Sequence, residues 1–132
     1  MGIYVHVPFC RSKCFYCGFY SVASLTLKEA YLEAVEREIV LRRGYLPRQE
    51  MKSLYFGGGT PSYLEHGDLE RIIRKLEENY LFATGMERTI ELNPEDLVPG
   101  KLQGIKDLGF NRLSIGVQSF SDEQLKRINR TH

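Results

Sequence analysis

The sequence has 132 residues, 42% of them hydrophobic and 27% charged, which is typical of one folded domain and excludes disordered, collagen-like and low-complexity chains. Its 18 Lys and Arg residues nearly balance its 17 Asp and Glu residues, so the formal charge is +1. A chain without a basic field attracts the nucleic-acid backbone poorly, and we expect no nucleic-acid partner.

The sequence also indicates where the protein works. No segment approaches the ~20 apolar residues that cross a bilayer, and the first ten residues lack the basic and long apolar regions of a signal peptide. The three cysteines, at positions 10, 14 and 17, are odd in number and crowded, unlike a secreted disulfide framework. These features predict a cytoplasmic protein with no transmembrane segment.

Predicted strands and helices alternate along the chain. Short apolar and β-branched runs predict strands at residues 3–8, 52–56, 88–92 and 111–117. Apolar residues at three- and four-residue spacing, with turn and capping residues beside them, predict helices at residues 27–43, 68–80, 99–108 and 121–128. Thr26 or Ser24 is the expected N-cap of the first helix.

Four strand–helix units in series favour an α/β fold with parallel strands joined by right-handed crossovers. No GxGxxG follows the first strand, so a dinucleotide-binding fold lacks its fingerprint. The chain is too short for a complete eight-unit barrel of ~250 residues. We therefore expect residues 1–132 to be a truncated part of a (β/α) barrel, whose fourth strand has an open edge.

The strongest chemical signal is the motif C-x3-C-x2-C formed by Cys10, Cys14 and Cys17, directly after the first strand. Closely spaced thiolates can surround one metal centre, and they suit iron–sulfur clusters and zinc. Three ligands are one short of a closed zinc site, and on a four-iron cluster they leave one iron open. Zinc completed by His6 or a distant residue, and three structural cysteines, are the alternatives.

The motif resembles the cluster motif of the radical S-adenosylmethionine (SAM) superfamily. The resemblance implies that the open iron of a [4Fe-4S] cluster binds SAM, whose reductive cleavage yields a 5′-deoxyadenosyl radical that abstracts hydrogen from a substrate. An electron donor protein is then a further expected partner.

Four longer strings make the resemblance more specific. They are YVHVPFC at residues 4–10, YFGGGTPS at 55–62, ELNPE at 91–95 and NRLSIGVQSF at 111–120, followed by Leu125 and the residues 130–132. Together they resemble the oxygen-independent coproporphyrinogen III oxidase family, including its heme-chaperone branch, over residues 3–132. The resemblance implies the N-terminal part of a radical SAM core domain.

The glycine string follows the second predicted strand, where barrel enzymes gather their sites, and glycines let the backbone approach a ligand closely. The resemblance assigns Gly58, Gly59 and Thr60 to the SAM pocket. The alternative is a turn that only reverses the chain.

Further SAM contacts are implied by the resemblance, each with a simpler alternative. Glu91 matches a SAM-binding glutamate but could be an outward-facing strand carboxylate. Gln118 and Arg130 match positions that contact a second SAM molecule or the substrate region, although Arg130 could be a solvated helix residue. Tyr4 and Tyr16 match SAM contacts, with ordinary strand packing as the alternative for Tyr4.

The remaining residues near the motif are given structural roles. His6 is expected in the core or as a group that supports the ligand residues. The aromatic rings around the cysteines suit a shielded cluster, and we expect Phe15 and Phe19 to belong to the core.

One departure favours a branch of the family. The oxidase proper usually carries a fourth cysteine two residues after the third, where this chain has Phe19, as in the heme-chaperone branch. A heme chaperone, with heme or porphyrin and a heme-acceptor protein as partners, is therefore the preferred function. A coproporphyrinogen III dehydrogenase of porphyrin biosynthesis and a zinc-structured binding module remain the alternatives.

Overall fold

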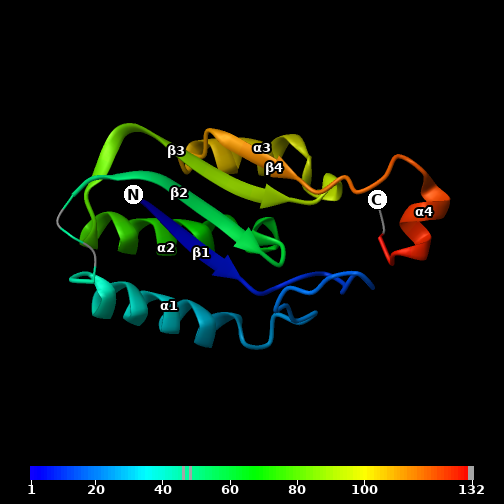
Figure 1. Cartoon of the computed structure of the whole chain (residues 1–132), viewed down its shortest axis with the longest axis horizontal. Helices are drawn as coiled ribbons and strands as arrows, with labels where there is room; N and C mark the ends of the chain where they lie inside the picture. Colours follow the sequence, from blue (N-terminus) through cyan, green and yellow to red (C-terminus); the bar gives the residue numbers. More distant parts are fainter. Residues whose placement is uncertain (46, 48, 131–132) are drawn as a thin grey trace.

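The structure is a computed structural model that describes residues 1–45, 47 and 49–130; the predicted motif residues 131 and 132 lie outside this range. Helices and strands alternate along the chain (Figure 1). The elements are β1 (Gly2–Val7), α1 (Lys28–Arg42), β2 (Met51–Gly58), the 3-10 helix η1 (Pro61–Tyr63), α2 (His66–Asn79), β3 (Phe82–Leu92), the 3-10 helix η2 (Pro94–Asp96), α3 (Pro99–Asp107), β4 (Arg112–Ile115) and α4 (Asp122–Arg127).

The strands form a four-stranded parallel sheet in the order β1-β2-β3-β4. Parallel neighbours need a crossover connection, and α1, α2 and α3 supply these crossovers. The predicted partial (β/α) arrangement is confirmed. All strands point the same way, so the segments that follow them gather at one end of the sheet (Figure 1).

The core lies between the sheet and the crossover helices. Alternate residues of neighbouring strands share one face, and on this face Val7, Phe56 and Ile90 have no exposed surface. Ile72 of α2 is equally buried against them, and Ile105 of α3 belongs to the same apolar cluster. The other face of the sheet carries more polar side chains, among them Tyr55, Thr89 and Glu91.

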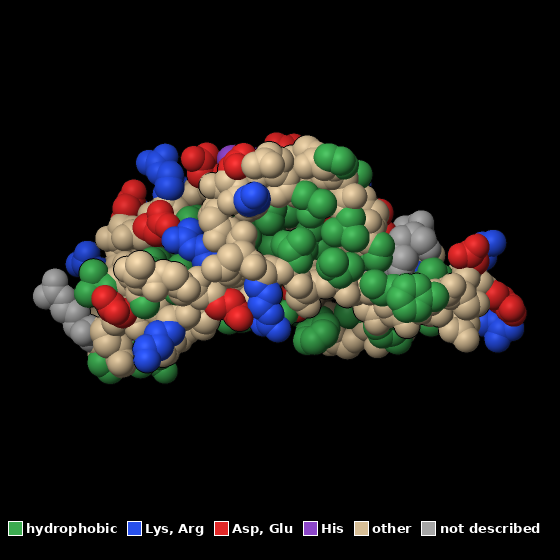
Figure 2. Space-filling view, turned by 90° about the horizontal axis from the view of Figure 1, so that it is seen from above, with side chains coloured by type: hydrophobic (Ala, Val, Ile, Leu, Met, Phe, Trp, Pro, Cys, Tyr) green, Lys and Arg blue, Asp and Glu red, His purple; other side chains and the backbone are tan. Residues whose placement is uncertain are grey.

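β4 is covered less than its neighbour. Its Leu113 and Ile115 pair with Ile90 and Leu92 and point to the same face, yet they are 41% and 40% exposed, against 0% and 2% for their partners. Figure 2, which looks down onto the side of β3 and β4, shows apolar side chains grouped there. This part of β4 is therefore left more open to solvent than the part of β3 with which it pairs.

The structure corrects several predicted details. Thr26 and Ser24 do not cap α1; its N-cap is Leu27, and the Ser24 hydroxyl instead accepts a bond from the Thr26 amide at 3.2 Å, which forms the preceding turn. β3 begins at Phe82 rather than at residue 88. Its pairing with β2 shifts register between Phe82 and Glu87, around Gly85 (φ +70°), and such a bulge interrupts the regular pattern without ending the strand.

No described helix has both the length and the apolar character that a membrane span requires.

Candidate functional site

The carboxyl ends of the four strands carry the chemistry-bearing segments. The cysteine loop, residues 8–27, follows β1, the glycine string ends β2, and the turn at residues 93–96 follows β3. The segment 116–121 follows β4. Parallel α/β folds place their ligands at this end of the sheet, so the topology brings distant parts of the sequence to one place.

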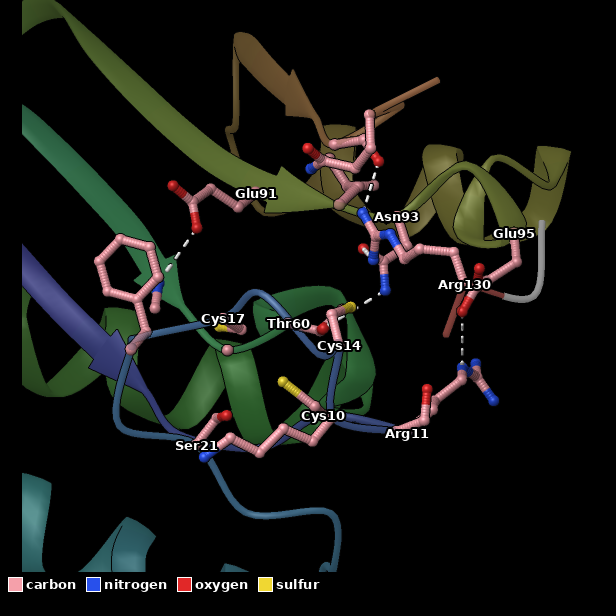
Figure 3. Close-up of a pocket in the computed structure, with 18 of the residues that line it drawn as sticks. Cys10, Arg11, Cys14, Cys17, Ser21, Thr60, Glu91, Asn93, Glu95 and Arg130 are labelled. Carbon is pink, nitrogen blue, oxygen red and sulfur yellow. Dashed lines mark hydrogen bonds and ion pairs between the residues drawn. The ribbon is translucent and has the colours of Figure 1, made fainter. Parts of the chain in front are cut away.

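One cavity of about 260 Å³ lies among these segments (Figure 3). Nearly all of the predicted site residues line it: Cys10, Cys14, Cys17, Tyr16, Gly58, Gly59, Thr60, Glu91, Gln118 and Arg130. Tyr4 does not. The structure therefore brings residues from all four strand ends into a common site.

The three cysteines are free thiols, each partly exposed at the cavity wall. Among the described residues no three His, Cys, Asp or Glu side chains converge as ligands of one metal ion. A four-iron cluster has less need of such convergence, because each thiolate binds a different iron. Three thiolates are one ligand short of a closed zinc site, whereas on a four-iron cluster they leave one iron open.

Gly59 packs directly against the cysteine loop. Its amide donates to the Val7 carbonyl at 2.7 Å, and a Cβ there would lie 2.7 Å from the Phe9 carbonyl oxygen and 3.0 Å from the Cys10 sulfur. Gly58, with φ of +110°, adopts a backbone conformation that favours glycine. These glycines therefore do more than reverse the chain: they let β2 approach the thiols.

Glu91 points into the cavity, so the outward-facing alternative is wrong (Figure 3). Its carboxylate accepts bonds from the Tyr55 hydroxyl at 2.6 Å and the Gly58 amide at 3.1 Å. Burial, followed by the hydrogen bond to Glu91, raises the pKa of Tyr55, so that Tyr55 remains a donor at neutral pH. Two donors thus fix a carboxylate beside the glycine string.

Arg130 follows α4 and returns to the cavity. Its guanidinium donates to Asn93 Oδ1 at 2.9 Å and to the Gly116 carbonyl at 2.6 Å, while its Nε is buried without a partner. The alternative of a solvated helix residue is therefore wrong. A buried donor without an acceptor is costly, so Arg130 Nε has capacity for a ligand.

Gln118 lines the same cavity with a left-handed backbone, at φ of 64°. Such a conformation is uncommon for a residue other than glycine and costs about 1–3 kcal/mol. Residues of this kind cluster at active sites and ligand-binding sites.

Tyr4 lies outside the cavity that holds the cysteines. It is 56% exposed, its ring stacks on that of Tyr55 at 6.0 Å, and its hydroxyl lies 3.1 Å from His6 Nδ1. His6 Nε2 is 3.0 Å from the Tyr20 carbonyl oxygen. His6 therefore joins β1 to the end of the cysteine loop, as expected for a supporting group.

The prediction that Phe15 and Phe19 belong to the core is wrong. They are 78% and 66% exposed, whereas Phe9, at the start of the loop, is 1% exposed. Phe9 still lies under the helix layer, where it packs edge-on against Tyr31. Residues 15 and 19 lie beyond the end of the sheet, where no described layer covers them.

Asn93 and Ser21 are two of the cavity residues that the sequence analysis did not single out. Asn93 donates to the Thr60 hydroxyl at 3.4 Å as well as accepting from Arg130, and its place within ELNPE could have indicated this role. Ser21 carries a buried hydroxyl without a partner at the cavity wall, and nothing in the sequence signals it.

Comparison with known proteins fits this site. The family model described as "Radical SAM superfamily" matches residues 4–132. The chain belongs to the radical SAM superfamily. The resemblance drawn from the cysteine motif is thereby confirmed. The relatives described next agree with the likeness drawn from the longer strings.

Relatives of this radical SAM chain carry two kinds of name. "Oxygen-independent coproporphyrinogen III oxidase" of Escherichia coli is 37% identical over 132 residues, which cover 98% of this chain and 29% of the enzyme. "Heme chaperone HemW" of Synechocystis is 41% identical over 136 residues, covering 98% of this chain and 32% of that protein. Identity to HemW of Bacillus subtilis is 36%, so identity does not separate the two groups.

A solved structure agrees with the fold. The structure described as "Coproporphyrinogen III oxidase (HemN) from Escherichia coli is a Radical SAM enzyme" matches with a TM-score of 0.91 and 37% identity. The match covers 99% of this radical SAM chain and 31% of the solved one. The chain thus spans about a third of the length of the proteins it resembles.

Proposed function

We propose that this chain holds a [4Fe-4S] cluster through Cys10, Cys14 and Cys17 and binds SAM beside it, as part of a protein that handles heme or porphyrin. One observation carries the proposal: the three thiols line the same cavity as the glycine string, Glu91 and Arg130. The membership of the radical SAM superfamily supports it.

The chain's own groups have distinct roles in this proposal. Gly58, Gly59 and Thr60 form a backbone wall along which SAM lies, and Glu91 supplies a fixed negative charge for its amino group. Arg130 and Gln118 face a second SAM molecule or the substrate region, and Tyr16 contacts SAM from the cysteine loop. Tyr4 supports this wall through Tyr55, which donates to Glu91. When bound, the cluster and SAM supply one-electron chemistry.

The preferred branch is the heme chaperone, with heme or porphyrin as cargo and a heme-acceptor protein and an electron donor protein as partners. Phe19 supports this branch, because it occupies the position of the oxidase's fourth cysteine and lines the cavity. Relatives named heme chaperone cover the whole chain, as "Heme chaperone HemW" of Buchnera aphidicola does at 33% identity.

The second candidate is a coproporphyrinogen III dehydrogenase of porphyrin biosynthesis. The observation in its favour is the match to the solved E. coli enzyme, at a TM-score of 0.91.

We further propose that residues 1–132 are the N-terminal part of a radical SAM core domain, in a cytoplasmic protein. The exposed apolar face of β4 and the one-third coverage of the relatives support the first part. Three closely spaced cysteines without a disulfide among them are typical of a reducing compartment and support the second.

The first experiment is anaerobic reconstitution of the intact protein with iron and sulfide, followed by reduction and electron paramagnetic resonance with and without SAM. We expect a cubane signal that changes when SAM is added. Zinc without sulfide in the purified protein would contradict the proposal.

The two branches are separated by a second pair of assays. A heme chaperone shows a heme Soret band and transfers heme to an apo-protein, whereas a dehydrogenase consumes coproporphyrinogen III and yields 5′-deoxyadenosine. We expect heme transfer, and we expect that Phe19→Cys does not create oxidase activity by itself. Oxidase activity in the unmodified protein would favour the second candidate.

A further inference from the structure

Asp96, at the end of η2, is a buried carboxylate that joins four segments of the chain. Its side chain is 1% exposed. It accepts hydrogen bonds from Ser62 of η1 at 2.5 Å, from Lys101 of α3 at 2.6 Å and from Arg11 of the cysteine loop at 3.3 Å. One side chain thus links the turn after β3 to three other parts of the molecule.

The partners of Asp96 keep it ionised. Burial by itself raises the pKa of this carboxyl group, but the hydrogen bonds from Lys101, Ser62 and Arg11 lower it, and the balance lies below the usual value. A buried carboxylate is tolerated only when it is paired and hydrogen-bonded. Removing its charge would leave Lys101 and Arg11 without their shared counter-ion.

Arg11 connects this carboxylate to the thiols. It stands directly after Cys10, it lines the cavity, and its guanidinium lies over the Tyr63 ring at 5.0 Å. Its Nε is 3.9 Å from a carboxylate oxygen of Glu95, as the dashed line in Figure 3 marks. Asp96 itself does not line the cavity, so it acts on the cavity only through its partners.

The stretch between Cys10 and Cys14 is held from both sides. Asp96 holds the side chain of Arg11, while Asn129, after α4, donates to the Lys13 carbonyl at 2.8 Å. The Phe15 amide also donates to the Ile128 carbonyl at 3.3 Å. Little regular secondary structure fixes this loop, so these long-range bonds set the relative positions of the first two thiols.

We propose that Asp96 is a positioning residue for the cluster, which fixes the spacing of Cys10 and Cys14 through Arg11 and ties their loop to the glycine string through Ser62. The proposal rests on the proposed function, since it requires that these thiols hold a cluster. Groups that bond directly to metal ligands typically change metal affinity about 10- to 100-fold when they are replaced. Asp96 acts through Arg11, so we expect the lower end of this range.

The test uses the reconstituted intact protein and follows the rate at which a chelator removes the cluster. Asp96→Asn, which keeps the shape and removes the charge, is expected to speed this loss about tenfold. Arg11→Gln should do the same, Arg11→Lys should lose its cluster more slowly than Arg11→Gln, and the Asp96→Asn/Arg11→Gln double variant should be no faster than either single one.

Asp68→Asn is the matched control. Asp68 also pairs with a lysine, at 2.8 Å from Lys28, and accepts a bond from the Glu65 amide at 3.1 Å, but it lies at the start of α2 and does not line the cavity that holds the thiols. We expect it to lower the unfolding temperature without changing the rate of cluster loss.

The outcomes separate the two proposals. Failure of the wild-type protein to assemble a cluster would overturn the proposed function. A wild-type cluster with Asp96→Asn no faster than Asp68→Asn, or with additive effects in the double variant, would overturn the positioning role alone. If Asp96→Asn does not fold, the contrast between Arg11→Gln and Arg11→Lys decides the question.

Discussion

The helix-covered face of the sheet and the carboxyl end of the same sheet differ in packing and in hydrogen bonding. Under α1 and α2, side chains such as Phe56 and Ile72 are fully buried in an apolar cluster. At the carboxyl end lie both of the buried polar atoms without a partner found in the described residues, Ser21 Oγ and Arg130 Nε. The left-handed Gln118 is there as well.

This difference indicates that stability and ligand binding belong to different parts of the chain. A close-packed face stabilises the fold through the burial of apolar surface, and it leaves no unpaired polar group or open space for a ligand. The carboxyl end keeps unpaired polar groups, free thiols and a strained backbone, which are features of a ligand-binding site. Substitutions on the two sides should therefore have separable effects.

The largest effect is expected at the cysteines. Cys14→Ser removes one thiolate from a set of three, so a cluster should no longer assemble stably, while the unfolding temperature of the cluster-free protein barely changes. Iron and sulfide content after reconstitution measures the first part. Ser12→Ala, in the same loop, is the control that should keep its cluster. Normal content and an unchanged signal in Cys14→Ser would show that the ligand assignment is wrong.

The next largest effect is expected in the apolar core under the helices. Ile72→Ala should lower the free energy of unfolding by about 2–5 kcal/mol, because it leaves a cavity at a residue with no exposed surface. The folded molecules should keep the SAM response of the cluster signal. Arg74→Ala, exposed on the same helix, should change the unfolding free energy by about 0.5 kcal/mol or less. Loss of SAM binding in folded Ile72→Ala would mean that packing in the core also controls ligand binding at the carboxyl end of the sheet.

Glu91→Gln tests the fixed charge in the cavity. The glutamine oxygen can still accept from the Gly58 amide while its NH2 group donates to the Tyr55 hydroxyl oxygen, which reverses that bond. The negative charge is lost, so the dissociation constant of SAM should rise about tenfold or more. Titration of SAM against the cluster signal measures it. Glu87→Gln is the matched control on the same strand, since Glu87 bonds Thr89 and Arg112 outside the cavity. Equal effects of the two substitutions would remove Glu91 from the SAM pocket.

The smallest effect is expected for Ser21→Ala. The hydroxyl has no partner within the described residues, so its removal should leave the stability of the cluster-free protein unchanged or slightly higher. In the reconstituted protein the same change should speed chelation of the cluster a few-fold, whereas Ser24→Ala should not. A marked loss of stability without the cluster would show that Ser21 serves the fold instead.

Much of the fold could be predicted because its signals are local. The alternation of strands and helices, the parallel sheet and the cavity at its carboxyl end follow from apolar spacing, turn residues and the cysteine motif. The details that failed depend on tertiary contacts. Phe15 and Phe19 are apolar in the sequence, but only the position of their loop beyond the helix layer shows that they are exposed.

The site shows the same division. The cysteines, the glycine string and Glu91 stand in recognisable strings, so their grouping could be expected. Asp96 acts through bonds to residues far along the chain, and Asn93 does so too, although its place within ELNPE is a signal. Ser21 is marked only by a buried hydroxyl without a partner, which no spacing in the sequence indicates. The contacts that support the site were therefore revealed by the structure.

The order of the chain has a consequence for how the site is made. Arg11 meets Asp96 across 85 positions, and Lys13 meets Asn129 across 116. At about 5–20 residues per second, a ribosome needs roughly 6–23 s to pass from residue 13 to residue 129. During synthesis the thiols therefore emerge long before the groups that fix their loop. We expect iron and sulfide to be loaded after translation of this region, onto a site that has already folded.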